Sequence, residues 1–281
     1  MGASKGSALP LILSLAGVAL ASARASGQTL DRSQDRGSGI PVSMFGTYIR
    51  PGELLVYPFF EYYRDGDAEY SPDELGYGLD QDFRGAYRAT EGLIFLGYGL
   101  SDRVAVEFEL AFISARQDKS PDDPTAMPQR IEESGLGDVE GQLRWRWQDE
   151  TNTRPELFSY FETVFPLQRD KKLIGTQEWE FKLGAGLIRG FKWGTGTLRL
   201  GIAYDEGSLA VGEYALEYLK RVSSVLRVYA GVEGSEDEVE LITETQWSLS
   251  PGIVLKLNNA FGITEKAADW APEVGLMLSF R

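Results

Sequence analysis

Two pairs of glutamates have the spacing of side chains that share one face of a strand, Glu107 with Glu109 and Glu178 with Glu180. Two carboxyl groups held at a fixed separation in a cleft can act as acid and base in glycoside hydrolysis. So many other acids share the same predicted face that neither pair is singled out. The sequence therefore does not favour a paired-carboxylate hydrolase.

Histidine and cysteine are both absent from the 281 residues. Without an imidazole a serine has no ordinary general base, and a Ser–Lys alternative needs a buried lysine that no pattern indicates. Zinc and haem lose their usual ligands for the same reason. We therefore expect no catalytic residue, no metal site and no cofactor.

Two shorter motifs resemble ligand sites but fail on spacing. An EF-hand loop that starts at Asp65 needs Gly at its sixth position and Glu at its twelfth, and the chain has Tyr70 and Gly76 there. The acidic stretch leaves open a loose association with calcium or with cations that bridge lipopolysaccharide. The glycines of 184–190 miss the dinucleotide-binding spacing by one residue and lie in a predicted strand, where glycine usually marks tight packing.

The elements that carry these acids are predicted to be strands. In residues 139–147 the odd positions are apolar, glycine or tryptophan, and the even positions are Glu, Gln or Arg. Side chains alternate between the two faces of a strand, so one face is apolar and the other charged. An apolar face meets a second sheet in a soluble sandwich, but meets lipid in an outer-membrane barrel.

Twelve runs with strand character follow one another after residue 52. They are 53–64, 83–98, 103–116, 135–148, 156–167, 177–190, 196–206, 210–221, 225–234, 239–248, 252–262 and 271–280. The first run is aromatic on both faces. The second places Glu91 on its apparent apolar face unless a bulge near Gly92 resets the alternation.

The connections between these runs alternate in length. Links such as 65–82 and 117–134 are long and acidic, whereas the links on the opposite side are short. Long loops on one side and short turns on the other are typical of bacterial barrels. We therefore predict an all-β protein, a transmembrane antiparallel β-barrel of about 12 strands with short periplasmic turns and longer extracellular loops.

The N-terminus has the features of an export signal. Lys5 precedes an apolar run of about a dozen residues, too short to span a bilayer, and small residues follow it. We predict a signal peptide at 1–25, a flexible lead-in at 26–52 that alternatively folds into the lumen as a plug, and an outer-membrane barrel at 53–281. Cleavage removes Lys5 and Arg24 from 28 basic residues, so 26 remain against 42 acidic residues, a net charge of −16 that argues against nucleic acid.

The charged faces of the predicted strands are expected to line the lumen. Their members are Glu107, Glu109, Glu140, Arg144, Arg146, Glu178, Glu180, Lys182, Arg199, Glu213, Glu217, Glu240, Glu244 and Lys256. The acids at 213–217 and 240–244 lie on the eighth and tenth strands, and the bases at 144–146 and 182 on the fourth and sixth. We expect an acidic wall opposite a basic wall, with a modest preference for cations.

Aromatic residues occupy positions that suit the membrane interfaces. Five tryptophans lie at or beside predicted strand ends, where an amphipathic ring is most stable: Trp147, Trp179, Trp193, Trp247 and Trp270. The last strand resembles a barrel assembly signal through Val274, Leu276, Leu278 and Phe280, although Arg281 follows the aromatic residue. The expected partners are outer-membrane lipid, lipopolysaccharide and the barrel-assembly machinery, and the expected state is a monomer.

Three stretches resemble one known family. They are GYGLSDRVAVEFE (97–109), ESGLGDVEGQLRWRW (133–147) and FETVFPLQRDKKLIGTQEWEFKLGAGLIRGF (161–191). Together with the rest of 55–281 they resemble the outer-membrane barrel family labelled "MetA-pathway of phenol degradation". The resemblance implies passive uptake of aromatic compounds and implies no functional residues.

The function expected from these features is a passive channel or transporter for small molecules, without enzyme activity. A non-conducting structural or surface-interaction barrel, with its acidic loops as the binding surface, is the alternative. An exported soluble β protein is a second alternative, and requires that the apolar faces are covered by another sheet.

Overall fold

The computed structural model describes residues 39–281 apart from residues 169, 177 and 206. The predicted signal peptide at 1–25 and the lead-in up to residue 38 lie outside the described residues. No helix in the described part of the chain is long and apolar enough to cross a membrane.

Twelve antiparallel strands close into one barrel, which confirms the predicted fold class. Each strand pairs with its neighbours in the sequence, and β14 closes the ring by pairing with β3. The strands are β3 (Leu54–Tyr70), β4 (Phe83–Gly99), β5 (Val104–Asp118), β6 (Arg130–Gln148), β7 (Glu156–Phe165), β8 (Glu180–Phe191), β9 (Gly194–Asp205), β10 (Ser208–Arg221), β11 (Leu226–Gly234), β12 (Val239–Ser250), β13 (Ile253–Gly262) and β14 (Ala271–Phe280).

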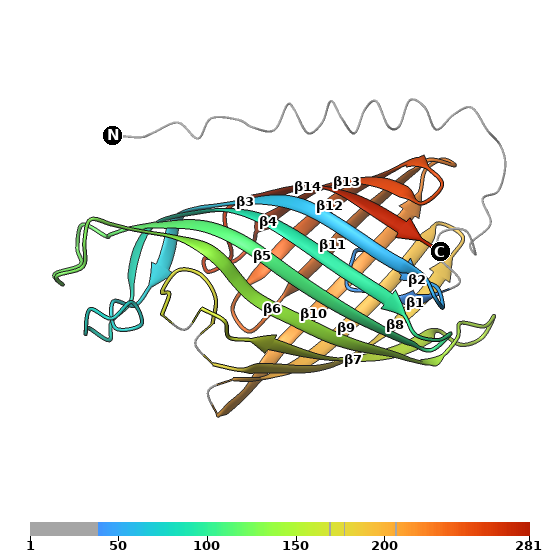
Figure 1. Ribbon diagram of the computed structural model, residues 1–281, viewed down its shortest axis with the longest axis horizontal. Helices are drawn as coiled ribbons and strands as arrows, with labels where there is room; N and C mark the ends of the chain where they lie inside the picture. Colours follow the sequence, from blue (N-terminus) through green and yellow to red (C-terminus); the bar gives the residue numbers. More distant parts are fainter. Residues whose placement is uncertain (1–38, 169, 177, 206) are drawn as a thin grey trace.

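The two ends of the barrel differ as the link lengths predict. The longest connections, 71–82, 119–129 and 166–179, are all at one end, on the left in Figure 1. The C-terminus and the short turns are at the other end. We assign the end with the long loops to the cell exterior and the end with the short turns to the periplasm.

The outer face of the barrel is apolar and uncovered, so the soluble alternative is wrong. On β6, Leu143 and Trp145 are 43% and 42% exposed, whereas Arg144 between them is 1% exposed and points inward. The same pattern follows the other strands, with Phe108, Leu183 and Leu200 among the exposed side chains. A continuous apolar surface around a closed sheet is the lipid-facing band of an outer-membrane protein.

The first two barrel strands turn apolar side chains inward as well. On β4, Leu93 and Phe95 are buried inside while Ile94 and Leu96 are exposed, and the pairing of β4 has no irregularity near Gly92. The bulge considered from the sequence is therefore not needed, because Glu91 belongs to the inner face. Leu55, Tyr57 and Phe59 of β3 join the same buried cluster.

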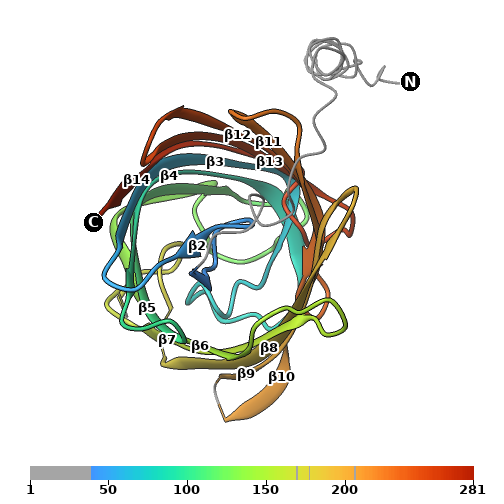
Figure 2. The ribbon, with the colours of Figure 1, turned by 90° about the vertical axis from the view of Figure 1, so that its right-hand side faces the viewer.

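The chain before the barrel fills this apolar lining. Residues 39–52 were expected within a flexible lead-in, but β1 (Ile40–Pro41) and β2 (Tyr48–Ile49) form an antiparallel hairpin inside the lumen, as Figure 2 shows. Ile40 and Ile49 are fully buried against the inner faces of β3 and β4. Residues 39–50 therefore lie inside the lumen. We call residues 39–50 the lumen hairpin.

The extracellular loops are folded rather than extended. Tyr70, Phe83 and Met127 form a small core under loops 71–82 and 119–129. Burial works to raise the pKa of Asp123 in the second loop, but hydrogen bonds from Thr125 and Tyr70 and the charge of Lys119 outweigh it and lower that pKa. The two loops therefore hold one another in place.

Aromatic side chains at the barrel ends are exposed as the sequence predicts. Trp147, Trp193 and Trp247 lie near the periplasmic end, and Trp179 and Trp270 near the other end, all between 38% and 60% exposed. On the last strand, Val274 and Phe280 are exposed, with Leu276 and Leu278 of the same outward alternation half-buried. The roles of these residues as a girdle and as an assembly signal remain predictions.

The outward and inward faces of β6 make a direct test of the barrel. Leu143→Arg places a charge on the lipid face and should cost about 2–4 kcal/mol of folding free energy if it lies at the bilayer midplane. Glu140→Arg, three residues away, points into a lumen cavity and should fold normally. Unheated samples refolded in vesicles should show the fast gel band of the folded barrel for Glu140→Arg and less of it for Leu143→Arg. Equal folding of the two variants would contradict the assignment of faces.

Candidate functional site

A buried ion pair attaches the lumen hairpin to the wall. Arg144 Nε of β6 lies 3.1 Å from Glu107 Oε1 of β5, and both side chains are 2% exposed. The Ser43 hydroxyl of the hairpin lies 2.5 Å from Glu107 Oε2 and accepts a hydrogen bond from Arg144 Nη2 at 2.8 Å. The Ser43 hydroxyl donates its one proton to Glu107, and Gln142 Oε1, 2.9 Å from that hydroxyl, accepts a hydrogen bond from Arg144 Nε at 2.5 Å. The hairpin thus completes the hydrogen bonding of two charges that the wall buries.

Aromatic rings surround the Arg144 guanidinium on the side away from the ion pair. Its Cζ lies 5.4 Å from the ring centroid of Phe158 and 5.2 Å from that of Tyr160. Such contacts stabilise a cation that has lost its water. A Cβ at Gly184 would lie 2.1 Å from the Tyr160 ring, so glycine there makes room for the ring. The glycines of 184–190 therefore serve packing, as the sequence indicates.

A second ion pair holds the tip of the hairpin from the opposite wall. Lys256 Nζ lies 3.0 Å from Glu244 Oε2, with both side chains 0% exposed, and 5.0 Å from the ring centroid of Phe45. Gln246 donates a hydrogen bond of 2.7 Å to the Phe45 carbonyl oxygen. The hairpin therefore spans the lumen between β5–β6 and β12–β13.

Arg199 forms the largest charge cluster of the lumen. Its guanidinium lies 2.7 Å from Glu213, 2.9 Å from Glu217 and 2.7 Å from Glu233. Since Glu244 pairs with Lys256, the predicted separation into an acidic and a basic wall is wrong. Consecutive strands pair in this barrel, and their bases lie beside the acids instead of across the lumen from them.

The other predicted lumen residues lie in ion pairs, along cavities or outside the wall. Lys182 Nζ lies 2.9 Å from Glu162, and Arg146 contacts Asp149 and Glu156 at the periplasmic rim. Glu109, Glu140, Glu180 and Glu240 line cavities in the extracellular half of the lumen. Glu178 was expected in the lumen wall, but it is exposed and precedes β8, because that strand begins two residues later.

Two cavities lie on the extracellular side of the lumen hairpin. The larger has a volume of about 410 Å³, and of the described residues that line it six are carboxylates and none is Lys or Arg. They are Glu61, Glu91, Glu109, Asp138, Glu140 and Glu180. The smaller, of about 310 Å³, adds Glu213, Glu233, Glu238 and Glu240 beside Arg199. Among the described residues, ten carboxylates and one base therefore line these two cavities.

Several of these carboxylates lie directly opposite one another on paired strands. Glu61 is opposite Glu91 on one side and Glu273 on the other, and Glu109 is opposite Glu140. Glu233 is opposite Glu240. Like charges that face each other across a ladder destabilise a sheet. The barrel thus maintains a concentration of negative charge at a cost in stability.

A loop from the wall narrows this acidic region. Residues 166–179 connect β7 to β8, and their Ile174 is 2% exposed against Ala89 and Ala115 of the inner wall. Glu133 accepts hydrogen bonds of 2.8 Å from the backbone nitrogens of Lys172 and Leu173, and Asp138 accepts from those of Leu167 and Thr176. The loop is therefore fixed inside the barrel above the larger cavity. Gly175 and Thr176 line that cavity.

The carboxylates do not form a metal centre. Across the described ranges, no group of three or more Asp or Glu side chains has the geometry to hold a metal ion. The arrangement is one of carboxylates spread along a wall.

The fold is similar to that of outer membrane proteins of known structure. An outer membrane channel from Pseudomonas putida F1 matches with a TM-score of 0.64 and 12% identity over 86% of this chain and 100% of that chain. The translocator domain of the autotransporter NalP from Neisseria meningitidis matches with a TM-score of 0.51 and 12% identity over 85% of this chain and 90% of that chain. At these identities the likeness shows the fold.

The chain is therefore an outer-membrane β-barrel protein, as its apolar outer band independently indicates. No protein-family model and no curated protein matches the sequence. The resemblance to the phenol-degradation family accordingly rests on the three stretches of sequence that carry it.

The sequence pattern did not reveal Ser43, Glu61, Glu162, Glu233 or Glu273. The register of neighbouring strands was the available signal, because Glu61 lies opposite Glu91 once β3 and β4 are paired. Glu162 lies on the same face of β7 as the inward Phe158 and Tyr160. Because β7 has aromatic residues on both faces, the alternation did not show which face is inward. Ser43 lies in a segment without any periodicity, so no pattern pointed to it.

Removing one partner of the buried Glu107–Arg144 pair should leave an uncompensated charge. We expect Arg144→Met and Glu107→Leu each to lower the free energy of unfolding by about 3–5 kcal/mol. The double variant should recover most of that loss, because neither charge remains. Tryptophan fluorescence during denaturant unfolding in micelles measures the free energy of unfolding of the wild type, the two single variants and the double variant. Additive losses in the double variant would show that the two residues do not act as a pair.

Proposed function

We propose that this protein is a passive outer-membrane channel for small solutes, with a preference for cations. The observation that carries the proposal is the distribution of charge along the lumen. Near the hairpin, bases such as Arg144 and Lys256 are paired with acids. On its extracellular side, ten carboxylates line two cavities that share the lining residue Tyr63, against Arg199 alone among the described lining residues.

An excess of one sign of charge on a water-filled wall selects by sign. The low-dielectric barrel around the cavities focuses the field into the lumen, so cations are concentrated there and anions depleted. The opposed pairs Glu109–Glu140 and Glu61–Glu91 gain stability when a cation lies between them. A cation bound between two such carboxylates therefore reduces the electrostatic repulsion between them.

The lumen hairpin limits the size and rate of what passes. A twelve-stranded barrel is wider than the eight-stranded barrels that wall side chains fill, and narrower than open porins. Here the hairpin occupies the periplasmic half, and the loop at 166–179 narrows the extracellular half. The expected conductance is small, and the permeants are small organic or inorganic cations. The aromatic compounds implied by the family resemblance are permeants of this channel only where they carry a positive group.

A non-conducting barrel is the second candidate, and the hairpin is the observation that favours it. In that case the folded loops 71–82 and 119–129 are the functional surface. Either function needs one chain only, because one chain closes the barrel. We propose a monomer that contacts lipid and lipopolysaccharide through the apolar band, and that presents β14 to the barrel-assembly machinery.

The cation preference is tested by neutralising the open carboxylates. In the quadruple variant Glu61→Gln, Glu91→Gln, Glu109→Gln and Glu140→Gln, the reversal potential in a tenfold KCl gradient should move toward zero. Each change replaces a cavity carboxylate with a neutral side chain of the same shape. These four sites are preferable to Glu213, Glu217 and Glu244, whose removal takes two of the three acidic partners from Arg199 and the acidic partner from Lys256.

Loop 71–82 supplies a matched control with the same change in net charge. Asp73→Asn, Glu74→Gln, Asp80→Asn and Asp82→Asn remove four exposed acids outside the lumen. This control should keep the wild-type reversal potential. If both variants behave as the wild type, the cavity carboxylates do not line the conducting path. Absence of conductance in the wild type would instead support the non-conducting barrel.

A further inference from the structure

The lumen hairpin is held firmly on two sides. Ser43 and the Pro41 carbonyl oxygen bind the Arg144 and Glu107 pair of β5 and β6. Phe45 is held by Gln246 and Lys256 of β12 and β13. These contacts join hairpin backbone to buried charges, so detaching the hairpin exposes both ion pairs at once.

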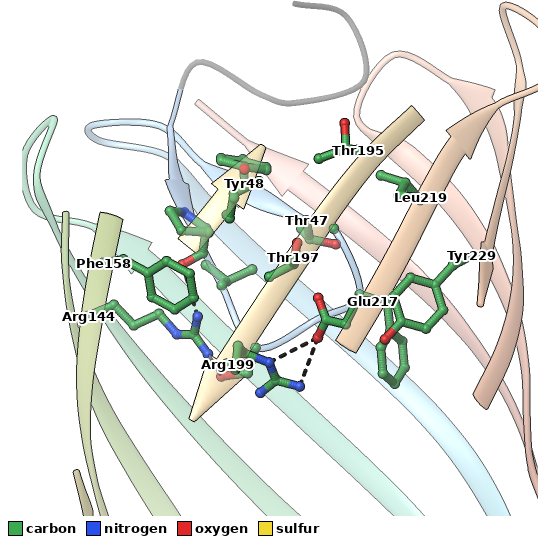
Figure 3. Close-up of a pocket in the computed structure, with 16 residues that line it drawn as sticks. Thr47, Tyr48, Arg144, Phe158, Thr195, Thr197, Arg199, Glu217, Leu219 and Tyr229 are labelled. Atoms are coloured by element: carbon green, nitrogen blue, oxygen red, sulfur yellow. Dashed lines mark hydrogen bonds and ion pairs between the residues drawn. The ribbon is translucent and has the colours of Figure 1, made fainter. Parts of the chain in front are cut away.

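A crevice remains between the hairpin and the wall formed by β6–β11. Its volume is about 30 Å³, and Figure 3 shows Thr47 of the hairpin facing Thr195 and Thr197 of β9, with Tyr229 of β11 beside them. That volume is the size of one water molecule. The crevice is therefore a place where the hairpin and the wall are not in full contact.

Two buried hydroxyl groups at the crevice lack partners. Thr47 is 5% exposed and Tyr229 is 4% exposed, and neither hydroxyl makes a hydrogen bond to any described residue. A buried hydroxyl without a partner is unfavourable, and it is satisfied when water or a polar solute reaches it. Both groups therefore indicate a polar path and not a sealed contact.

Arg199 lies where this crevice meets the smaller extracellular cavity. Its side chain lines both spaces. Glu217 also lines the crevice, whereas Glu213 and Glu233 line the cavity, and all three hold the guanidinium at 2.7–2.9 Å. Because acceptors lie on both sides, the guanidinium can shift from one set to the other without losing every partner.

From this geometry we infer that solutes pass the hairpin through the crevice, with Arg199 as the gating residue at its extracellular entrance, while the hairpin stays attached to β5 and β6. The inference rests on the proposed channel function and assigns its path. Thr47, Thr195, Thr197 and Tyr229 line the narrow segment. Movement of the Arg199 guanidinium toward Glu213 and Glu233 opens the narrow segment of the crevice toward the smaller cavity, of about 310 Å³.

A cross-link distinguishes passage beside the hairpin from release of the hairpin. The chain has no cysteine, so Ser43→Cys with Gln142→Cys introduces the only two thiols, at positions whose side chains touch across hairpin and β6. A short bis-methanethiosulfonate reagent joins them, and mass spectrometry confirms the bond. Single-channel current should stay within twofold of the uncross-linked value. Current that falls to baseline and returns with dithiothreitol would overturn the crevice path.

A label in the crevice gives the complementary result. Thr197→Cys modified with a methanethiosulfonate ethylammonium reagent should lose more than half of its current. Ala111→Cys, which lines the wide 410 Å³ cavity, should lose clearly less. Full current in the labelled Thr197 variant would overturn the path, provided that the folded gel band is unchanged. If the unmodified protein does not conduct at all, the proposed channel function itself fails, and this inference fails with it.

Discussion

The ion pair between Glu107 and Arg144 joins three parts of the molecule that are far apart in the sequence. Both charges point inward because the outer face of β5 and β6 must be apolar to meet lipid. At that level the lumen is too dry to hydrate them, so each needs protein partners. Ser43 and the carbonyl oxygen of Pro41 supply those partners, and the lumen hairpin is positioned as a result.

The same constraint explains why the lumen has two electrostatic regions. Where the hairpin excludes water, as at Lys256, acids and bases are matched one to one or surrounded by rings. Where the cavities are open, water hydrates the carboxylates, and pairs such as Glu109 and Glu140 are tolerated side by side. The proposed preference for cations thus rests on the open region, and the proposed restriction on size rests on the closed one.

The sequence predicted the barrel because lipid imposes a strict alternation on strands such as β6, where Leu143 and Arg144 have opposite environments. It predicted strands at β3 and β4 but did not resolve their faces, because Leu93 and Phe95 face an apolar hairpin and the alternation disappears. The hairpin itself has no period, and its position depends on charges about 60 and 100 residues later, at Glu107 and Arg144. The partners of Arg199 depend on strand register, which periodicity alone does not give. Register places Arg199 opposite Ala215, between Glu213 and Glu217.

Hydrogen–deuterium exchange of the folded protein in lipid nanodiscs tests the central claim, that the lumen hairpin is a fixed part of the barrel interior. The amides of Val42 and Thr47 donate to Thr47 and Met44 within the hairpin, at 3.0 Å and 2.6 Å, and residues 40 and 49 pair beside them. Peptides that cover 39–50 should exchange as slowly as peptides from β12 and β13. Complete exchange of 39–50 at the earliest time point, with the barrel strands still protected, would contradict the account.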